Sequence, residues 1–126
     1  MAVTGIGGFF FRSNDPKGLA AWYLEHLGVG APEGVYLWNQ QAGPTVFAPF
    51  EKDSDYFAAD KRFMLNLRVD DLAGMLASLK AAGIEIITKA EWDTSPEMGK
   101  FARIHDPEGN PIELWEPPAT APAESA

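Results

Sequence analysis

Two side chains near the end of the chain are of the types that proton-transfer chemistry uses. His105 and Glu113 lie eight residues apart, on either side of a polar turn. An imidazole and a carboxylate can act as general acid and base, and an arginine such as Arg103 can stabilise a developing oxyanion. The pair is therefore a candidate for proton abstraction beside a carbonyl. A structural role is the alternative, with His105 exposed before the turn and Glu113 paired with Arg103 across two strands.

The composition limits other chemistries. The chain has no Cys and two His. A disulfide framework, a thiolate metal site, a Cys nucleophile and a three-His metal site within one chain are therefore excluded. Ser13 and Ser54 have no His beside them, so no Ser–His–Asp triad is indicated. No glycine-rich segment precedes a helix at the spacing of a phosphate-binding loop.

Length and charge narrow the class of protein further. The 126 residues fit one domain, and 10 basic against 18 acidic residues give a net charge of −8. This balance argues against binding to nucleic acid or to an anionic membrane surface. No apolar run approaches the roughly 20 residues of a membrane span, and residues 1–5 do not have the pattern of a secretory leader. We expect a cytoplasmic protein with neither nucleic acid nor membrane as a partner.

The elements that position these side chains form two similar series, and the first occupies the N-terminal half. Apolar and aromatic residues predict a strand over 3–12. A helix follows, which Asp15 caps and Gly28 ends. Two short strands over 34–39 and 45–50 come next, before a loop over 51–62.

The second series repeats this order about 55 residues later. A strand over 63–69 precedes a helix that Asp70 caps and Gly83 ends. The last three predicted strands cover 84–88, 101–105 and 111–115. The polar turn over 106–110 joins the final two as a hairpin. Residues 118–126 are rich in Pro and Ala and predict a flexible tail.

This duplicated order resembles the vicinal oxygen chelate superfamily, which includes glyoxalases, bleomycin-resistance proteins and extradiol dioxygenases. The closing run DPEGNPIEL (106–114) carries the resemblance, and WYLEHLG (22–28) supports it. The likeness covers about 3–117, within one glyoxalase-like domain. It implies an α+β fold of two β-α-β-β-β modules, about 3–52 and 61–117, forming a U-shaped mixed sheet around a cleft. It also implies a homodimer.

The resemblance also locates the positions at which metal-dependent members hold their metal. The matching positions in this chain are Gly8, Phe47 or Ala48, Met64 and Glu113. Only Glu113 has a ligand side chain, and one carboxylate does not hold a catalytic metal. We therefore expect neither metal nor cofactor.

Strand alternation from these positions predicts which side chains face the cleft. The predicted cleft residues are Phe10, Arg12, Asn66, Arg68, Arg103, His105, Glu113 and Trp115. Ala102 and Ile104 then face the helices. Several arginines on a concave face suit carboxylate or phosphate groups, because the guanidinium fork matches their geometry. The predicted ligand is a small, partly aromatic, anionic molecule.

Three interpretations of the cleft follow. The first is metal-independent binding or sequestering of such a molecule. The second is a lyase or isomerase of the glyoxalase-like group, with Glu113 as base or as metal ligand. The third is a dimeric scaffold whose own aromatic side chains fill the cleft. Local ion pairs, Arg12 with Asp15 and Arg68 with Asp70, are alternatives to ligand contact for those two arginines.

Overall fold

A computed structural model of the chain describes residues 1–32, 34–35, 37–93 and 95–119. The described part holds two α-helices, three strands and two short 3-10 helices. In chain order they are α1 (Pro16–Leu27), β1 (Leu65–Arg68), α2 (Leu72–Ala81), η1 (Ala90–Asp93), η2 (Pro96–Met98), β2 (Lys100–His105) and β3 (Pro111–Glu116). None of the described helices combines the length and the apolar character needed to cross a bilayer.

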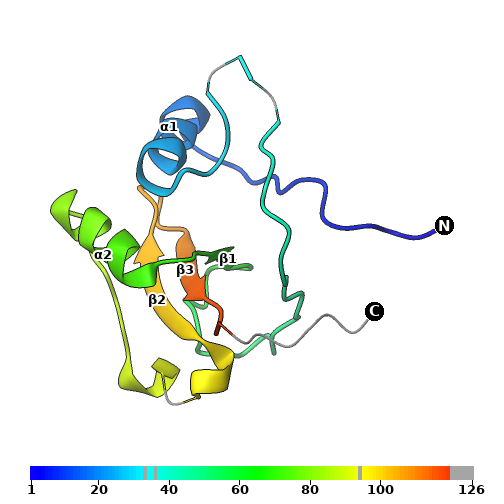
Figure 1. Ribbon diagram of the computed structural model, residues 1–126. Coiled ribbons are helices and arrows are strands. Elements are labelled where there is room, and N and C mark those ends of the chain that lie inside the picture. The colour runs from blue at the N-terminus through cyan, green and yellow to red at the C-terminus, as the bar shows by residue number, and fades with distance from the viewer. Residues whose placement is uncertain (33, 36, 94, 120–126) are drawn as a thin grey trace.

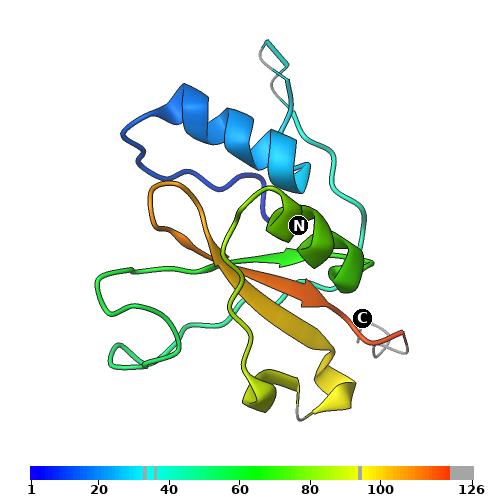
Figure 2. The ribbon, with the colours of Figure 1, turned by 90° about the vertical axis from the view of Figure 1, so that its left-hand side faces the viewer.

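The three strands form one mixed sheet with β3 at its centre (Figure 2). β1 runs parallel to β3, and β2 runs antiparallel to it as a hairpin. Both helices lie on the same face of this sheet (Figure 1). The α+β class predicted from the sequence is confirmed.

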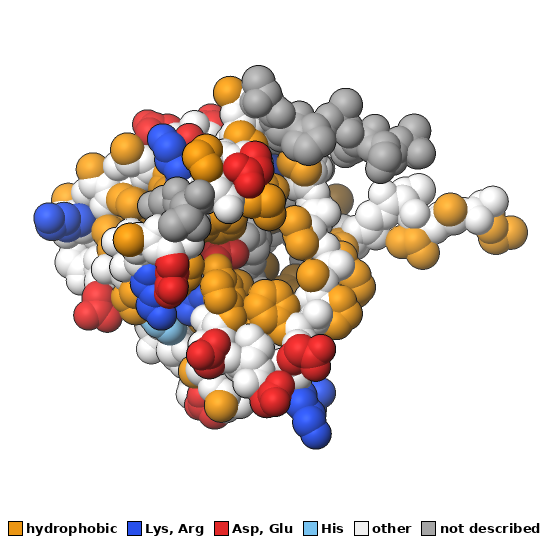
Figure 3. Space-filling view, turned by 90° about the horizontal axis from the view of Figure 1, so that it is seen from below, with side chains coloured by type: hydrophobic (Ala, Val, Ile, Leu, Met, Phe, Trp, Pro, Cys, Tyr) orange, Lys and Arg blue, Asp and Glu red, His pale blue; other side chains and the backbone are white. Residues whose placement is uncertain are grey.

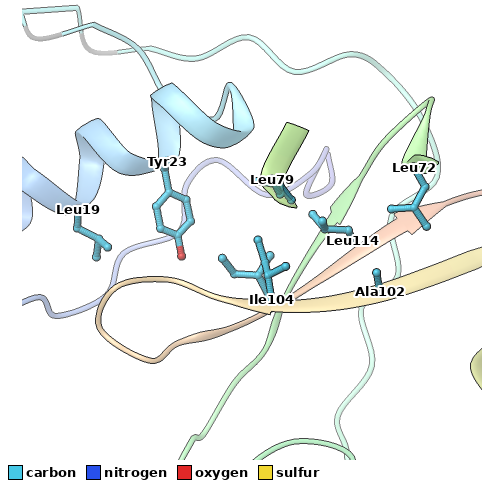
Figure 4. Packing of buried hydrophobic residues seen from close by; sticks show 8 residues of the cluster. Leu19, Tyr23, Leu72, Leu79, Ala102, Ile104 and Leu114 are labelled. Carbon is cyan, nitrogen blue, oxygen red and sulfur yellow. The ribbon is translucent and has the colours of Figure 1, made fainter. Parts of the chain in front are cut away.

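The core lies between the helices and that face of the sheet (Figure 4). Its buried members are Leu19 and Tyr23 of α1, Leu72 and Leu79 of α2, and Ala102, Ile104, Ile112 and Leu114 of the sheet. The four sheet residues are fully buried. Because side chains alternate along a strand, Arg103 and Glu113 between them point to the opposite face. Ala102 and Ile104 face the helices, as expected.

The helix ends agree with the sequence to within one residue. The Asp15 side chain accepts a hydrogen bond from Gly18 N at 3.1 Å, and Gly28 ends α1 in the left-handed conformation. The prediction that Asp70 caps α2 is wrong. Asp71 is the cap, because its carboxylate accepts from Gly74 N at 3.0 Å.

The predicted strands of the first series do not form in the described residues. Residues 3–12, 37–39 and 45–50 run as extended chain, and their side chains are exposed except that of Phe11, which packs against the core (Figure 1). The predicted strand over 84–88 is reduced to one bridge, between Ile87 and Arg103. Apolar and β-branched composition favours extended chain, but a strand also requires a partner with matching backbone groups. The sheet therefore belongs to the second series alone, and the two-module U-shaped sheet is not seen.

The loop over 51–62 contains neither helix nor strand, as expected. Most of the tail predicted to be flexible, residues 120–126, lies outside the described residues.

A buried carboxylate in the hairpin turn ties α1 to the sheet. Asp106 is 4% exposed and accepts a hydrogen bond from the Tyr23 hydroxyl at 2.7 Å. The same carboxylate accepts from the backbone N–H of Glu108 and of Asn110, at 2.8 and 3.0 Å, and so shapes the turn. The Asp106 side chain therefore stabilises both the turn and the helix. The same hydrogen bonds offset the cost of burying its carboxylate.

The next acidic residue of the turn fastens the start of the same helix. Glu108 accepts hydrogen bonds from the Ser13 hydroxyl at 2.6 Å and from the backbone N–H of Asn14 and Asp15 at 2.9 and 3.2 Å. The bonds to Ser13 and Asn14 are the main reasons why the pKa of Glu108 is lowered. The turn thus holds α1 at two places.

Replacing Tyr23 with Phe should lower the free energy of unfolding by about 1–3 kcal/mol, because a buried carboxylate loses one of its donors. Urea unfolding followed by circular dichroism measures the change. Glu25→Gln, on the same helix with a side chain 74% exposed, is the control and should change stability little. A Tyr23→Phe variant as stable as the control would contradict the role given to this bond.

The stability of the same variant should also differ from that of wild type in its dependence on alkaline pH. Burial, followed by the hydrogen bond to Asp106, raises the pKa of Tyr23 above its ordinary value of about 10. The unfolded chain then loses this proton at a lower pH than the folded chain. The contribution of Tyr23 to stability is therefore complete below about pH 10 and declines above it. Wild type should lose stability above this pH more steeply than Tyr23→Phe, and equal slopes would argue against the assignment.

Candidate functional site

A row of polar side chains crosses the middle of the sheet on the face away from the helices. The strand register places Asn66 of β1 beside Glu113 of β3, and Glu113 beside Arg103 of β2. Glu113 and Arg103 are each only 6% exposed. Buried charges are costly unless they are paired or hydrogen-bonded. The partners of these two groups therefore decide what the row can do.

Both oxygens of Glu113 accept hydrogen bonds from neutral donors. The Tyr56 hydroxyl donates to Oε2, and Asn66 Nδ2 donates to Oε1 at 2.8 Å. Burial, and then the bond to Glu113, raises the pKa of Tyr56 above its ordinary value. Tyr56 therefore stays protonated at neutral pH and acts as a donor, and Glu113 acts as an acceptor.

The guanidinium of Arg103 contacts two neighbouring aromatic rings but is not fully hydrogen-bonded. Its central carbon lies 5.1 Å from the ring centre of Tyr56 and 5.3 Å from that of Trp92, which is the geometry of cation–π contacts. Nη2 donates to the backbone oxygen of Tyr56 at 3.1 Å. The buried Nε has no hydrogen-bond partner among the described residues. A buried cationic donor without a partner favours the approach of an anion.

A pocket of about 480 Å³ opens beside this guanidinium. Its walls are the loop over 53–59, η1 with the preceding Lys89, and the sheet residues Ile87 and Arg103. Figure 3 looks onto this end of the molecule and shows hydrophobic side chains around a hollow, with acidic side chains along the rim. The volume suits a small organic molecule. Lys89 Nζ lies 5.6 Å from the Trp92 ring centre, so two cations flank that ring.

A second hollow of similar size lies between η2 and the end of β3. Its two charged residues, Lys100 and Glu116, lie 3.8 Å apart as an exposed ion pair. The polar row and the Arg103 guanidinium make the first pocket the better candidate site.

Two further predicted site residues lie in the next row of the same sheet, but they bind other parts of the chain. Arg68 and Trp115 are opposite one another in the strand register. Arg68 donates to the backbone oxygens of Pro44 and Gln41, rather than to Asp70. Trp115 Nε1 donates to Met98 O at 2.8 Å, and its ring stacks on Phe101. These side chains fix loops and the sheet end.

The remaining predicted site residues are not brought into the row. Phe10 is 90% exposed, and Arg12 is also exposed on the chain before α1. His105 is exposed at the end of β2, where its register partner is Pro111. No hydrogen bond joins His105 to Glu113 in the described part of the chain, so the acid–base pair suggested by the sequence is not assembled.

Sequence reasoning did not assign Tyr56, Trp92 or Lys89 to the site. All three lie in loops or in η1, where no helical or strand periodicity indicates which way a side chain points. The sequence showed only aromatic residues among polar ones in a loop, and this pattern does not predict which residues their side chains contact.

A metal does not fit the row. Both Glu113 oxygens are already hydrogen-bonded, and the residues described include no group of three or more His, Asp or Glu that could hold a metal ion. The other positions that the resemblance assigns to metal ligands carry glycine or apolar side chains.

Comparison with known proteins gives a relation at the level of the fold. No protein-family model matches the chain. No curated protein matches it. The chain is similar to the crystal structure of TnmS3, an antibiotic binding protein from Streptomyces sp. CB03234, with 23% sequence identity and a TM-score of 0.60. The likeness covers 93% of this chain and 98% of TnmS3. The chain therefore shares its fold with TnmS3.

Proposed function

We propose that this protein binds a small, partly aromatic, anionic molecule without a metal, in the pocket beside Arg103. The observation that carries the proposal is the buried guanidinium, which makes cation–π contacts with Tyr56 and Trp92 and has an Nε without a hydrogen-bond partner among the described residues. Aromatic walls and a cation together select a flat molecule that carries an acid group. The protein is also proposed to be cytoplasmic, and its acidic balance argues against a nucleic-acid or anionic-membrane partner.

The structural neighbour supports the same function. TnmS3 is described as an antibiotic binding protein, and the fold it shares with this chain is suited to small-molecule binding. We propose that this chain belongs to the bleomycin-resistance-like branch of the vicinal oxygen chelate superfamily, and the fold shared with TnmS3 supports this proposal.

The geometry favours binding over proton abstraction by Glu113. A general base needs a free lone pair directed at the substrate, within hydrogen-bond reach of the proton it removes. Both Glu113 oxygens instead accept from Tyr56 and Asn66. Each oxygen keeps a second lone pair, but Glu113 is 6% exposed, so a lyase or isomerase would have to bring its substrate into the buried row to use it.

We further propose that the protein is a homodimer in which the extended N-terminal segments pair with a second copy. Residues 3–12 and 45–50 carry apolar side chains that one copy leaves in water. The most exposed of them are Val3, Phe10, Val46 and Phe47, at 92%, 90%, 71% and 85%. Burial of this surface and of the unpaired backbone groups favours association. The pairing would complete the first β-α-β-β-β module that the sequence predicts.

Two probes of the same shape test the proposed ligand class. Isothermal titration should show that 2-naphthoate binds about tenfold more tightly than neutral 2-naphthamide, because only the acid compensates the buried guanidinium. Arg103→Gln should abolish this preference, whereas Arg12→Gln, which changes an exposed arginine, should retain it. Circular dichroism confirms that each variant is folded. If the amide bound as tightly as the acid to wild type, the proposed ligand class would be wrong.

Sedimentation equilibrium tests the dimer. Wild type should have twice the mass of the chain, and the double variant Phe10→Ser/Phe47→Ser should have the mass of one chain, because it removes two large exposed apolar side chains. Lys17→Ser/Lys80→Ser is a control with equally many surface changes on the helices and should remain dimeric. A monomeric wild type would contradict the proposal.

A further inference from the structure

Tyr56 occupies the polar row in the way a bound ligand would. Its hydroxyl donates to Glu113, its backbone oxygen accepts from Arg103 Nη2 at 3.1 Å, and its ring covers the guanidinium at 5.1 Å. The ring also lies 6.1 Å from that of Trp92. One residue thus provides the row with a hydroxyl donor, an oxygen acceptor and an aromatic face.

The segment that carries Tyr56 is otherwise held by local contacts. Within residues 51–62, Ser54 N donates to Glu51 O at 3.0 Å, and Lys61 N donates to Ala58 O at 3.0 Å. Tyr56 N donates to the Ser54 hydroxyl at 3.2 Å. These bonds stay within the loop and involve no strand of the sheet. The loop can therefore move away from the row without breaking the ladder between β1, β3 and β2.

Departure of Tyr56 would leave one atom of each of the two buried charged groups without its partner. Glu113 Oε2 would lose its donor, and Arg103 Nη2 would lose its acceptor, in addition to Nε, which already has none in the described structure. A buried charged group that lacks a hydrogen-bond partner is costly. Any molecule that replaces Tyr56 must therefore offer a donor to Glu113 and an acceptor to Arg103.

We infer that the ligand is a hydroxylated aromatic acid that displaces Tyr56, placing its hydroxyl on Glu113 and its acid oxygen on Arg103. This inference rests on the proposed function and specifies its ligand class. The aromatic body of the ligand takes the place of the tyrosine ring against Arg103 and Trp92. The acid group gives the guanidinium a charged partner, which the backbone oxygen of Tyr56 does not, and this difference favours the ligand over the internal occupant.

Tyr56→Phe provides the decisive test because it keeps the ring and removes only the hydroxyl. Glu113 Oε2 then lacks a donor, which a ligand hydroxyl restores. The probes are 3- and 4-hydroxybenzoate, with benzoate as the reference that lacks the hydroxyl. Titration should show that benzoate and the hydroxybenzoates all bind about tenfold more tightly to Tyr56→Phe than to wild type, because the variant has no internal hydroxyl to displace, and that both proteins prefer the better hydroxybenzoate over benzoate to the same extent. Phe63→Leu, an aromatic change directly after the loop and outside the pocket walls, is the control and should keep the wild-type affinities.

Tyr56→Ala gives an independent readout. If Tyr56 competes with the ligand, its removal should tighten the binding of both benzoate and the hydroxybenzoates. If its ring were instead a wall of the ligand site, both probes would bind more weakly, and the inference would be overturned. The melting temperature of each variant, with and without probe, verifies that a folded protein is being titrated.

The outcomes separate this inference from the proposed function. Probe binding to Tyr56→Phe that is no tighter than to wild type overturns the inference, and the proposed function then still stands if wild type prefers 2-naphthoate to 2-naphthamide. If no aromatic acid binds to wild type or to either Tyr56 variant, both are overturned.

Discussion

The structure depends on the burial of Arg103 and Glu113 in neighbouring positions at the middle of a small sheet. The buried strand residues that face the helices are all apolar. The polar side chains at the centre of the strands therefore point to the other face of the sheet. Buried charges must be hydrogen-bonded, and the chain meets this requirement for Glu113 with Tyr56 and Asn66. It meets the requirement only in part for Arg103, and the pocket lies beside this group.

The rest of the fold keeps this sheet in place. The hairpin turn between β2 and β3 holds α1 through Asp106 and Glu108, so the helix from the first half of the chain covers strands from the second half. The site is built on rigid strands on one side and on loop residues on the other. Such a combination suits ligand binding, since the strands fix the charged groups while the loop carrying Tyr56 can adjust.

Sequence reasoning predicted which strand residues share the sheet face of Glu113, but not which loop residues pack over them. Alternation along 101–105 and 111–115 correctly separated Ala102 and Ile104 from the opposite face, because a period of two is a strong signal. Tyr56 and Trp92 carry no such signal, since loop side chains take directions that only tertiary contacts determine. Residues 3–12 and 45–50 have the composition of strands, but composition does not identify a pairing partner. The cap of α2 was misplaced by one residue because Asp70 and Asp71 are adjacent and only the contact with Gly74 distinguishes them.

The most direct test of the account is to observe the Arg103 guanidinium while ligand is added. In a ¹H–¹⁵N spectrum, Arg103→Lys identifies the Nε–H signal of Arg103, and the wild-type protein is then titrated with 2-naphthoate. The account predicts that this signal shifts to saturation with the acid and stays in place with 2-naphthamide. A signal that does not move while the acid binds, with shifts at Arg12 or Arg68 instead, would contradict the claim that Arg103 receives the anion.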